Sequence, residues 1–351
     1  MSDQARHYGG VATFGGSPAA PGNRTNVYAA KELLKFARAH DPFAPVTKKL
    51  RVPTNVSETA KWRRIVPDLA TDSAITEGVN PDWQGISYED VEATFEERVE
   101  IYAVTSRARY LSEDDHVSNT VFQLRDKVLR IRTAVMWAVF RAGTNVIYND
   151  PTHTARNEVD GPISLGILQE AVRGLHRNKA DVFREVDNGG VNSGTVPVEP
   201  TYIGLSHTDI LPDLRRVEGW TTTAEYGGNK QVHTLERGSV ENTRFLLSPE
   251  LGPFEDSGAA VGSTNMKASG DDIDVYPILI CGREALGCAD LMGKGKMGYG
   301  GVKVNIVDGA DKADPANLNV LAVAHWFDAD VILNDAWLVR LEVGATDNLS
   351  A

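Results

Sequence analysis

Few residues of this chain have the types and spacing that could do chemistry. The segment GKGKMG, residues 293–298, matches the G-x-G-x-x-G spacing of loops that bind nucleotide phosphates. That chemistry needs a strand before the loop and a helix N-terminus after it, because the helix supplies N–H groups that hold phosphate. Here the segment YGGVKVNIV follows instead, and its pattern predicts a strand. The motif therefore predicts a turn rich in glycine and lysine, and a nucleotide-binding enzyme is the less favoured alternative.

The titratable residues form no recognisable catalytic or metal-binding group. His207 lies two residues before Asp209, which could make an acid–base pair, but this spacing is also typical of residues that cap a short helix. The run DDID, residues 271–274, lacks the ligand spacing of a calcium loop. Cys281 and Cys288 are not spaced as a zinc or redox pair, so we expect buried free thiols. The sequence therefore predicts no catalytic residue, no metal and no cofactor.

Composition argues against two broad classes of function. The formal net charge of -12 disfavours a protein whose main task is to grip nucleic acid, since such binding uses clustered Lys and Arg. No apolar run reaches the roughly 18 residues that a membrane span needs. The N-terminal segment 1–23 also lacks the apolar core of a signal peptide. We therefore expect a protein made in a reducing cytoplasm, with no membrane contact.

An unusually long strand is the most distinctive element of the sequence. Apolar and polar residues alternate almost without a break from residue 90 to 103, which predicts one strand with a wet face, although Glu96 and Glu97 stand where more apolar alternation is expected. The expected buried side consists of Val91, Ala93, Phe95, Val99, Ile101 and Ala103. Because strands usually have about 5–6 residues, this one is longer than its own domain requires.

A second strand, TAKWRRIV at residues 59–66, carries the opposite charge. It contains Lys61, Arg63 and Arg64. The long strand contains Asp90, Glu92, Glu96, Glu97 and Glu100. Opposite charges across a ladder stabilise it, so we predict an antiparallel hairpin in which some of these charges face each other, with the register left open. Connections beyond about 12–15 residues are uncommon unless they have a function, and the one between these strands has about 20.

The other elements favour an α+β fold class. A long helix is predicted from an apolar stripe at helical spacing. The stripe consists of Val117, Val121, Leu124, Val128, Ile131, Val135 and Ala138. A shorter amphipathic helix is predicted from Ser164. The segment 321–343 predicts a helix, with His325 packed in the core, that turns at Asn334 and Asp335 into a strand. Helices and antiparallel strands are interspersed without a βαβ rhythm, which is typical of α+β proteins.

Six segments in order resemble the major capsid proteins of tailed phages, specifically the N4-like major capsid family with the HK97-type fold. They are RTNVYAAKELLKFA (24–37), AITEGVNPDWQGISYEDVEATFEE (74–97), RAGTNVIY (141–148), RGSVENTRFLLSP (237–249), DVYPILICGREALG (274–287) and DADVILNDAWLVRLEV (328–343). The resemblance spans nearly the whole chain. No single segment is decisive, but six in register are specific.

The resemblance implies a division of the chain. Residues 1–45 would form an N-terminal arm, 46–110 an extended β-hairpin loop (the E-loop) with its strands, and 111–160 a peripheral domain with a long spine helix. Residues 161–314 would form an axial domain, and 315–351 would return to the peripheral domain. The strand near residue 90 would be long because it lies across a neighbouring subunit.

The resemblance also implies intersubunit contacts. At the loop tip these are Ile75, Thr76, Glu77, Gly78, Val79, Pro81 and Trp83. On the loop strands they are Lys61, Arg63, Arg64, Glu92, Glu96, Glu97 and Glu100, and on the arm Arg24, Asn26, Tyr28 and Leu34.

The implied function is self-assembly into hexamers and pentamers of an icosahedral head that encloses double-stranded phage DNA. The implied partners are copies of the chain, with scaffold, portal and decoration proteins as further candidates, and DNA that is faced without sequence-specific binding. The implied location is the virion, assembled in the cytoplasm of a bacterial host. An encapsulin-type shell protein of the same fold is the alternative.

Overall fold

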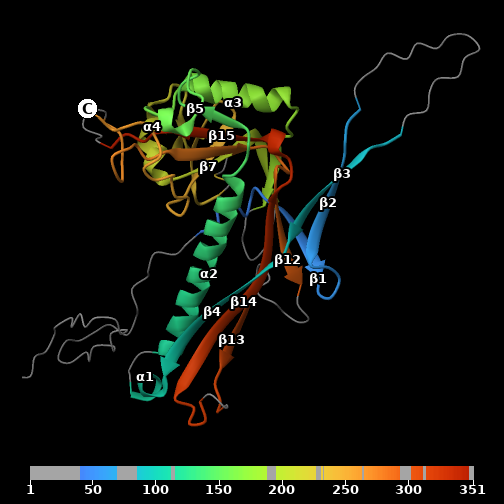
Figure 1. Cartoon of the computed structure of the whole chain (residues 1–351), viewed down its shortest axis with the longest axis vertical. Coiled ribbons are helices and arrows are strands. Elements are labelled where there is room, and N and C mark those ends of the chain that lie inside the picture. Colours follow the sequence, from blue (N-terminus) through green and yellow to red (C-terminus); the bar gives the residue numbers. More distant parts are fainter. Residues whose placement is uncertain are drawn as a thin grey trace, which may run out of the picture. The chain divides into compact units, whose positions relative to one another are not determined.

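The computed structural model describes residues 40–68, 85–111, 115–187, 195–226, 231, 233–262, 265–292, 302–310 and 314–347. In this part of the chain, Glu100–Asp126 and Val304–Ala324 belong to a first compact unit. The second unit comprises Ala39–Val99, Lys127–Lys303 and His325–Ala351. Three elements continue from one unit into the other (Figure 1): β4 (Glu96–Thr105), α2 (His116–Phe140) and β14 (Asn319–Ile332). The short helix α1 (Ser106–Leu111) lies in the first unit.

The second unit contains an eight-stranded sheet in the order β5-β15-β11-β7-β10-β9-β8, with β6 paired to β7. The strands are β5 (Val146–Tyr148), β6 (Phe183–Asp187), β7 (Thr195–Ser206), β8 (Thr221–Thr222), β9 (Glu236–Val240), β10 (Thr243–Leu247), β11 (Tyr276–Cys281) and β15 (Leu338–Val343). β11 pairs antiparallel with both β15 and β7, whereas β7 and β10 are parallel. Every residue of β11 is buried, which explains why its sequence, YPILIC, is an almost unbroken apolar run.

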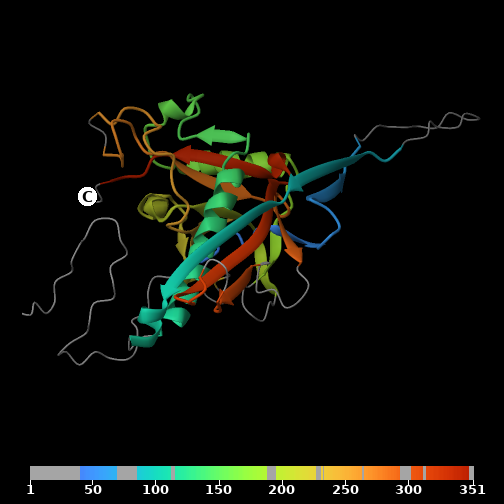
Figure 2. The same ribbon diagram turned by 60° about the horizontal axis from the view of Figure 1, so that its bottom comes forward.

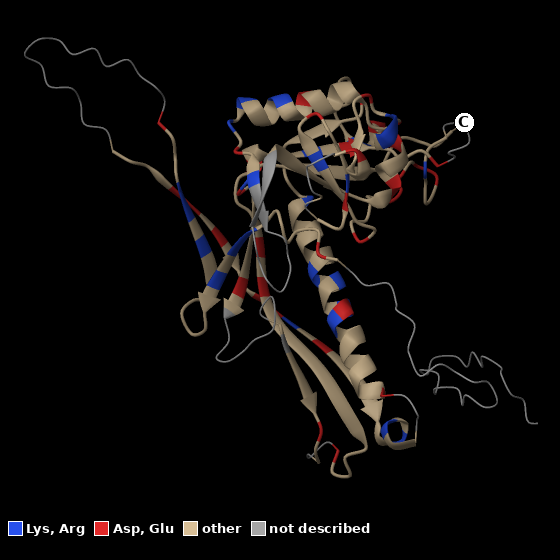
Figure 3. Cartoon of the chain, turned by 180° about the vertical axis from the view of Figure 1, so that it is seen from behind, with Lys and Arg blue, Asp and Glu red and all other residues tan. Residues whose placement is uncertain are grey.

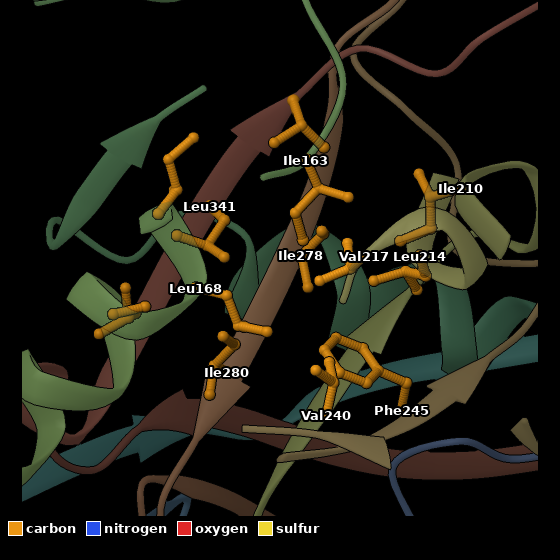
Figure 4. Packing of buried hydrophobic residues seen from close by; sticks show 14 of the residues in the cluster. Ile163, Leu168, Ile210, Leu214, Val217, Val240, Phe245, Ile278, Ile280 and Leu341 are labelled. Atoms are coloured by element: carbon orange, nitrogen blue, oxygen red, sulfur yellow. The ribbon is translucent and has the colours of Figure 1, made fainter. Parts of the chain in front are cut away.

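One face of this sheet packs against α3 (Leu165–Arg177) and α4 (Leu211–Arg216). Ile278 and Ile280 of β11 join this cluster, together with Leu341 of β15 (Figure 4). The buried residues of α3 recur at helical spacing: Ile167, Leu168, Ala171, Val172 and Leu175. The helix predicted from Ser164 is therefore confirmed.

The opposite face packs against the C-terminal part of α2. Leu279 and Cys281 alternate with the residues of the first face and contact a cluster that includes Met136, Trp137 and Phe140 of α2. The predicted long helix is confirmed, and Leu124 and Val128 of its stripe are buried. Ala138 was wrongly assigned to the stripe and is exposed, because the sheet is contacted by the larger neighbours Trp137 and Phe140.

Arg340 of β15 anchors the end of α2. Its Nη1 atom donates to the carbonyl oxygen of Gly143 at 2.9 Å and also to that of Arg141. Both carbonyl groups lie in the segment that directly follows the last residue of α2. Glu342, two residues along the strand and fully buried, lies 2.8 Å from the Nε atom of Arg340. The ion pair thereby fixes where α2 meets the sheet.

A second sheet has the order β1-β12-β14-β13, and β4 also pairs with β14. Its other strands are β1 (Lys48–Pro53), β12 (Leu286–Met292) and β13 (Lys303–Val307). The prediction of a helix after residue 320 is wrong, because residues 319–332 form the strand β14. Val320, Ala322, Ala324 and Trp326 are buried at a spacing of two. The alanines favour a helix locally, and pairing with β12 and β4 overrides that preference.

His325 lies on the opposite side of β14 from Trp326, so its expected place in the core is wrong. Its side chain is 33% exposed, and its Nε2 atom lies 2.7 Å from Glu97 Oε1. The later part of the prediction is confirmed. The chain turns at Asn334, whose side chain accepts from Ala336 N, and continues through the 3-10 turn η5 (Asp335–Trp337) into β15. The other 3-10 turns in the described part of the chain are η1 (Arg156–Glu158), η2 (Thr208–Ile210) and η3 (Thr223–Glu225).

The predicted hairpin is confirmed as a two-stranded sheet of β2 (Thr59–Ile65) and β3 (Tyr88–Thr94). The two strands run side by side in Figure 1 and Figure 2. The expectation of one unbroken strand is wrong, because β3 ends before Phe95 and β4 begins at Glu96. With these sheets and helices, the α+β fold class is confirmed.

The face that the chain buries also changes at this break. Val91 and Ala93 are half-buried before it, as expected. After it, Val99 and Ile101 are 49% and 57% exposed, and Val104 is buried instead. The alternation therefore slips by one residue at Glu96 and Glu97, which are both exposed.

Candidate intersubunit surface

The base of the β2–β3 hairpin is fixed to the second sheet by small residues. Ala60 is only 1% exposed and packs in one cluster with Ala289 of β12 and Ala329 of β14. The half-buried side chains of Trp62, Ala93, Phe95, Leu50 and Val52 pack against this cluster. Alanine lets the two backbones approach closely, so the base of the hairpin forms part of the second unit's packed interior.

The far end of the hairpin has apolar side chains that the described part of the chain leaves exposed. Ile65 and Tyr88 face each other in the last pair of the ladder and are 61% and 58% exposed. Ile86, just before β3, is 66% exposed. Neighbouring exposed apolar residues on a strand pair are typical of a surface that contacts another molecule.

Four cross-strand ion pairs hold the hairpin together, three of them between directly opposed residues. In the observed register, Lys61 faces Glu92, Arg63 faces Asp90 and Arg64 faces Glu89. Lys61 Nζ lies 2.6 Å from Glu92 Oε1. Arg64 Nε donates to Glu89 Oε2 at 2.9 Å. Basic residues of β2 and acidic residues of β3 are visible along the two strands in Figure 3.

Asp90 is the best-connected carboxylate of the hairpin. Arg63 donates to it twice, from Nε at 2.7 Å and from Nη2 at 3.0 Å, and Lys61 Nζ lies 3.3 Å away. The hydrogen bonds from Arg63, aided by Lys61, lower the pKa of Asp90 to about 2. The hydrogen bond to Glu92 raises the pKa of Lys61. Asp90, Lys61 and Arg63 are therefore charged at neutral pH.

The register decides which of the predicted acidic residues belong to the ladder. Asp90 and Glu92 are confirmed as partners of basic residues on β2. Glu96 pairs instead with Arg98 of its own strand, Glu97 with His325, and Glu100 lies in β4 beyond the ladder. Glu89 was missed, because the predicted strand began one residue later. No pattern in the residue types marks that start.

A buried set of charges lies in the second sheet. Asp290 of β12 faces Asp328 of β14, and Cys288 faces Asp330. Arg132 of α2 donates to Asp290 Oδ1 at 2.7 Å. Burial raises the pKa of Asp330 to about 6, and the nearby Asp328 adds to the shift. Arg98 Nε lies 3.0 Å from Asp328 Oδ1.

Several predicted contact residues lie outside the described residues. They are the loop-tip residues Ile75, Thr76, Glu77, Gly78, Val79, Pro81 and Trp83 and the arm residues Arg24, Asn26, Tyr28 and Leu34. The GKGKMG segment, 293–298, lies outside them as well.

The residues weighed for chemistry have structural roles where they are described. His207 caps η2 by accepting from Asp209 N at 3.1 Å, as expected. The Asp209 carboxylate accepts from Tyr276 and pairs with Lys267. Cys281 and Cys288 are buried free thiols, as expected, and burial raises the pKa of each.

Within the described ranges, no three His, Cys, Asp or Glu side chains gather as a metal site. None of the described helices is long and apolar enough to cross a membrane.

Comparison with solved structures identifies the fold. The chain is similar to the capsid protein of Ralstonia phage GP4, with 13% identity, a TM-score of 0.63, and coverage of 98% of this chain and 100% of that one. It is also similar to the capsid chain of cyanophage Pam1, with 10% identity, a TM-score of 0.62 and coverage of 94% and 99%. The capsid of cyanophage P-SCSP1u gives 14% identity, a TM-score of 0.58 and coverage of 93% and 96%.

No protein-family model matches the chain, and no curated protein sequence matches it. The structural likenesses show that the chain has the HK97-type α+β fold of phage capsid proteins. The α+β architecture of this fold, predicted from the sequence, is thereby confirmed.

Proposed function

We propose that this chain is the major capsid protein of a tailed phage and that it assembles into hexamers and pentamers of an icosahedral head around double-stranded DNA. The observation that carries the proposal is the full-length likeness to the capsid protein of Ralstonia phage GP4, which spans 98% of this chain and all of the other. A likeness to capsid chains along the whole length favours a shell-forming role over a catalytic one. Membership of the N4-like family is the finer part of the proposal, and the six resembling segments support it.

The proposed role of each region of the chain follows from the resemblance. Residues 1–45 act as an arm, 46–110 as the extended loop, 111–160 as the peripheral domain with α2 as its spine helix, 161–314 as the axial domain, and 315–351 as the return segment. The tip and arm residues named above contact neighbouring copies.

The β2–β3 hairpin is the stiff part of the proposed extended loop. Its base is packed on Ala289 and Ala329, and its ion pairs hold the two strands in register. Its far end presents Ile65 and Tyr88, which are exposed in the single chain. A neighbouring subunit that covers these side chains would bury apolar surface worth about 25 cal/mol per Å². In this proposal the ion pairs set the direction of the loop, and the apolar end provides the affinity.

Further partners follow from the same proposal. Scaffold, portal and decoration proteins contact the shell, and the packaged DNA is faced without sequence-specific binding, in keeping with the net charge of -12. The protein is located in the virion after assembly in the host cytoplasm.

The test is assembly of the purified chain, alone and with a scaffold protein from the same phage, followed by sedimentation and negative-stain imaging. We expect hexamers, pentamers or closed shells. A compact monomer under all conditions would overturn the proposal. Shells that enclose a dedicated cargo protein and need no phage protein would favour the encapsulin alternative.

A further inference from the structure

Three guanidinium groups surround the ring of Phe254 in the second unit. The guanidinium carbons of Arg156, Arg141 and Arg340 lie 3.5, 4.8 and 6.0 Å from the ring centroid. They come from distant parts of the sequence: Arg156 from η1, Arg141 from the residue after α2, and Arg340 from β15. An aromatic face attracts cations, so the ring holds the three groups together in spite of their like charge.

The carboxylate of Glu342 lies in this cluster and already pairs with Arg156 and Arg340. Glu342 is fully buried and accepts from Arg156 twice, at 2.8 Å from Nε and 2.8 Å from Nη2. Its Oε1 atom also lies 2.8 Å from Arg340 Nε. Among the described residues, no carboxylate pairs with the guanidinium of Arg141. Within the described ranges, the cluster therefore holds three positive charges against one negative charge.

Among the described residues, the carbonyl groups just after α2 do not neutralise Arg141 either. A cation at a helix C-terminus is usually stabilised by the free carbonyl groups there. Here the carbonyl oxygens of Arg141 and Gly143 accept from Arg340 instead. Burial together with the charges of Arg156 and Arg340 lowers the pKa of Arg141, as expected for a cation that lacks a counter-charge.

The side chain of Arg141 is only partly buried, and that of Arg156 is 32% exposed. An incoming group can therefore reach the site from outside. The guanidinium group of an arginine can donate from two parallel N–H groups. When its orientation is fixed and it has no carboxylate partner, it matches the planar geometry of a carboxylate or a phosphate.

We propose that Arg141, beside Arg156 and Phe254, binds an Asp or Glu carboxylate of a second copy of this chain. The inference rests on the proposed shell-forming function. The chain has 48 acidic against 36 basic residues, so a second copy offers many carboxylates, and the same excess disfavours a nucleic acid phosphate. The contact places this positive cluster of one subunit against a carboxylate of the next and is repeated in every subunit of the lattice.

The first test compares charge variants of Arg141 by shell yield and by melting of the isolated subunit. Arg141→Gln removes a repulsion inside the subunit, so its melting temperature should equal or exceed that of the wild type. Its shell yield should nevertheless fall by at least about tenfold, as expected for the loss of a charge-assisted contact between subunits. Arg141→Glu should lower the yield further, and Arg141→Lys should keep most of it.

Arg173→Glu is the matched control. Arg173 is exposed on α3, so this variant makes the same change of charge as Arg141→Glu at a different place. We expect near wild-type yield. If the wild type assembles and Arg141→Gln assembles equally well, the inference fails while the proposed function stands. If the wild type forms no assembly under any condition, both fail.

The second test identifies the carboxylate directly. Arg141→Lys shells are assembled from a mixture of ¹⁴N-labelled and ¹⁵N-labelled chains and treated with a carbodiimide, which joins an amine to a touching carboxylate. Mass spectrometry should find the lysine at position 141 linked to an Asp or Glu peptide, with mixed-isotope pairs that prove a contact between chains. The link should be absent from dissociated subunits. A link to Glu342 of the same chain alone, or no link, would overturn the inference.

Discussion

Arg63 and Asp90 face each other across the β2–β3 ladder and are joined by two parallel hydrogen bonds, of 2.7 and 3.0 Å. A bidentate pair fixes the relative orientation of two side chains as well as their distance. Both residues are exposed on the hairpin, so water and salt screen the pair and its effect on the stability of one subunit is small. In the proposed shell, the effect of this pair on the direction of the hairpin is repeated in every subunit.

Reversing the basic charges of the hairpin tests that effect. We expect Arg63→Glu with Arg64→Glu to leave the melting of isolated subunits almost unchanged, because the pairs are exposed. Shell yield, measured by light scattering at low salt, should fall strongly, because the hairpin loses its orientation.

The observed register defines the matched rescue. Adding Asp90→Arg and Glu89→Arg restores opposite charges across the same pairs and should recover part of the yield. Adding Glu96→Lys and Glu97→Lys should not, because those residues lie outside the ladder. Equal yields for all variants would show that the charges form only a solvated face.

Replacing residues 70–84 with a short Gly-Ser turn tests the proposed contact of the loop tip. The base of the hairpin is packed on Ala289 and Ala329, so the variant should remain a folded subunit with near wild-type circular dichroism and melting. It should form no shells if, as proposed, the tip's partner is another chain. Normal assembly would rule out an intersubunit role for the tip, and outright unfolding would place the tip in the subunit's own core.

Enlarging the alanine contact at the hairpin base should destabilise the subunit itself. Ala60→Leu adds three carbon atoms at a site that is 1% exposed and packed against two other alanines. Overpacking of this kind costs about 1–3 kcal/mol, which urea unfolding of the isolated subunit can measure. Thr59→Val, at the exposed neighbouring position, serves as the control and should change stability little.

Asp330 should give the subunit a measurable dependence of stability on pH. Its folded-state pKa of about 6 lies above the usual value, so the carboxyl group contributes fully below about pH 4 and its contribution is lost as pH rises through 6. Asp330→Asn should therefore stabilise the subunit at pH 8 by on the order of 1–2 kcal/mol and change little at pH 4.

The control for this effect is Asp271→Asn, at an exposed position in the loop before β11. It should shift the unfolding midpoint equally at both pH values or not at all. A gain from Asp330→Asn that is the same at pH 4 and pH 8 would contradict the ionisation argument.

Much of the fold could be predicted from periodicity. The α+β class, α2, α3 and the β2–β3 pairing all follow from apolar spacing and from opposite charges on two strands. These elements are predictable because each buries one regular face of its own sequence.

Three features could not be predicted, each for a physical reason. The helix expected after residue 320 is a strand because pairing with β12 and β4 outweighs the local preference of its alanines. The break at Phe95 was missed although Glu97 interrupts the alternation, because the alternation resumes in the same phase from Val99 to Ala103 while the chain turns its other side inward. Register across the hairpin, and with it the role of Glu89, depends on where the strand begins, which residue types do not reveal.

The change of buried face at Glu96 and Glu97 affects how the segment formed by β3 and β4 tolerates mutation. In β3 the sheltered positions are odd-numbered, such as Val91 and Ala93, whereas in β4 they are even-numbered, such as Tyr102 and Val104. A scan of single aspartate substitutions through residues 88–105 should therefore show sensitivity that changes parity near residue 96. In the isolated subunit, Val99 and Ile101 should tolerate the change. If aspartate at these two positions disrupts only assembled particles, the odd-numbered side of β4 contacts a neighbouring subunit. Residues 88–105 then carry two separate sets of evolutionary constraints.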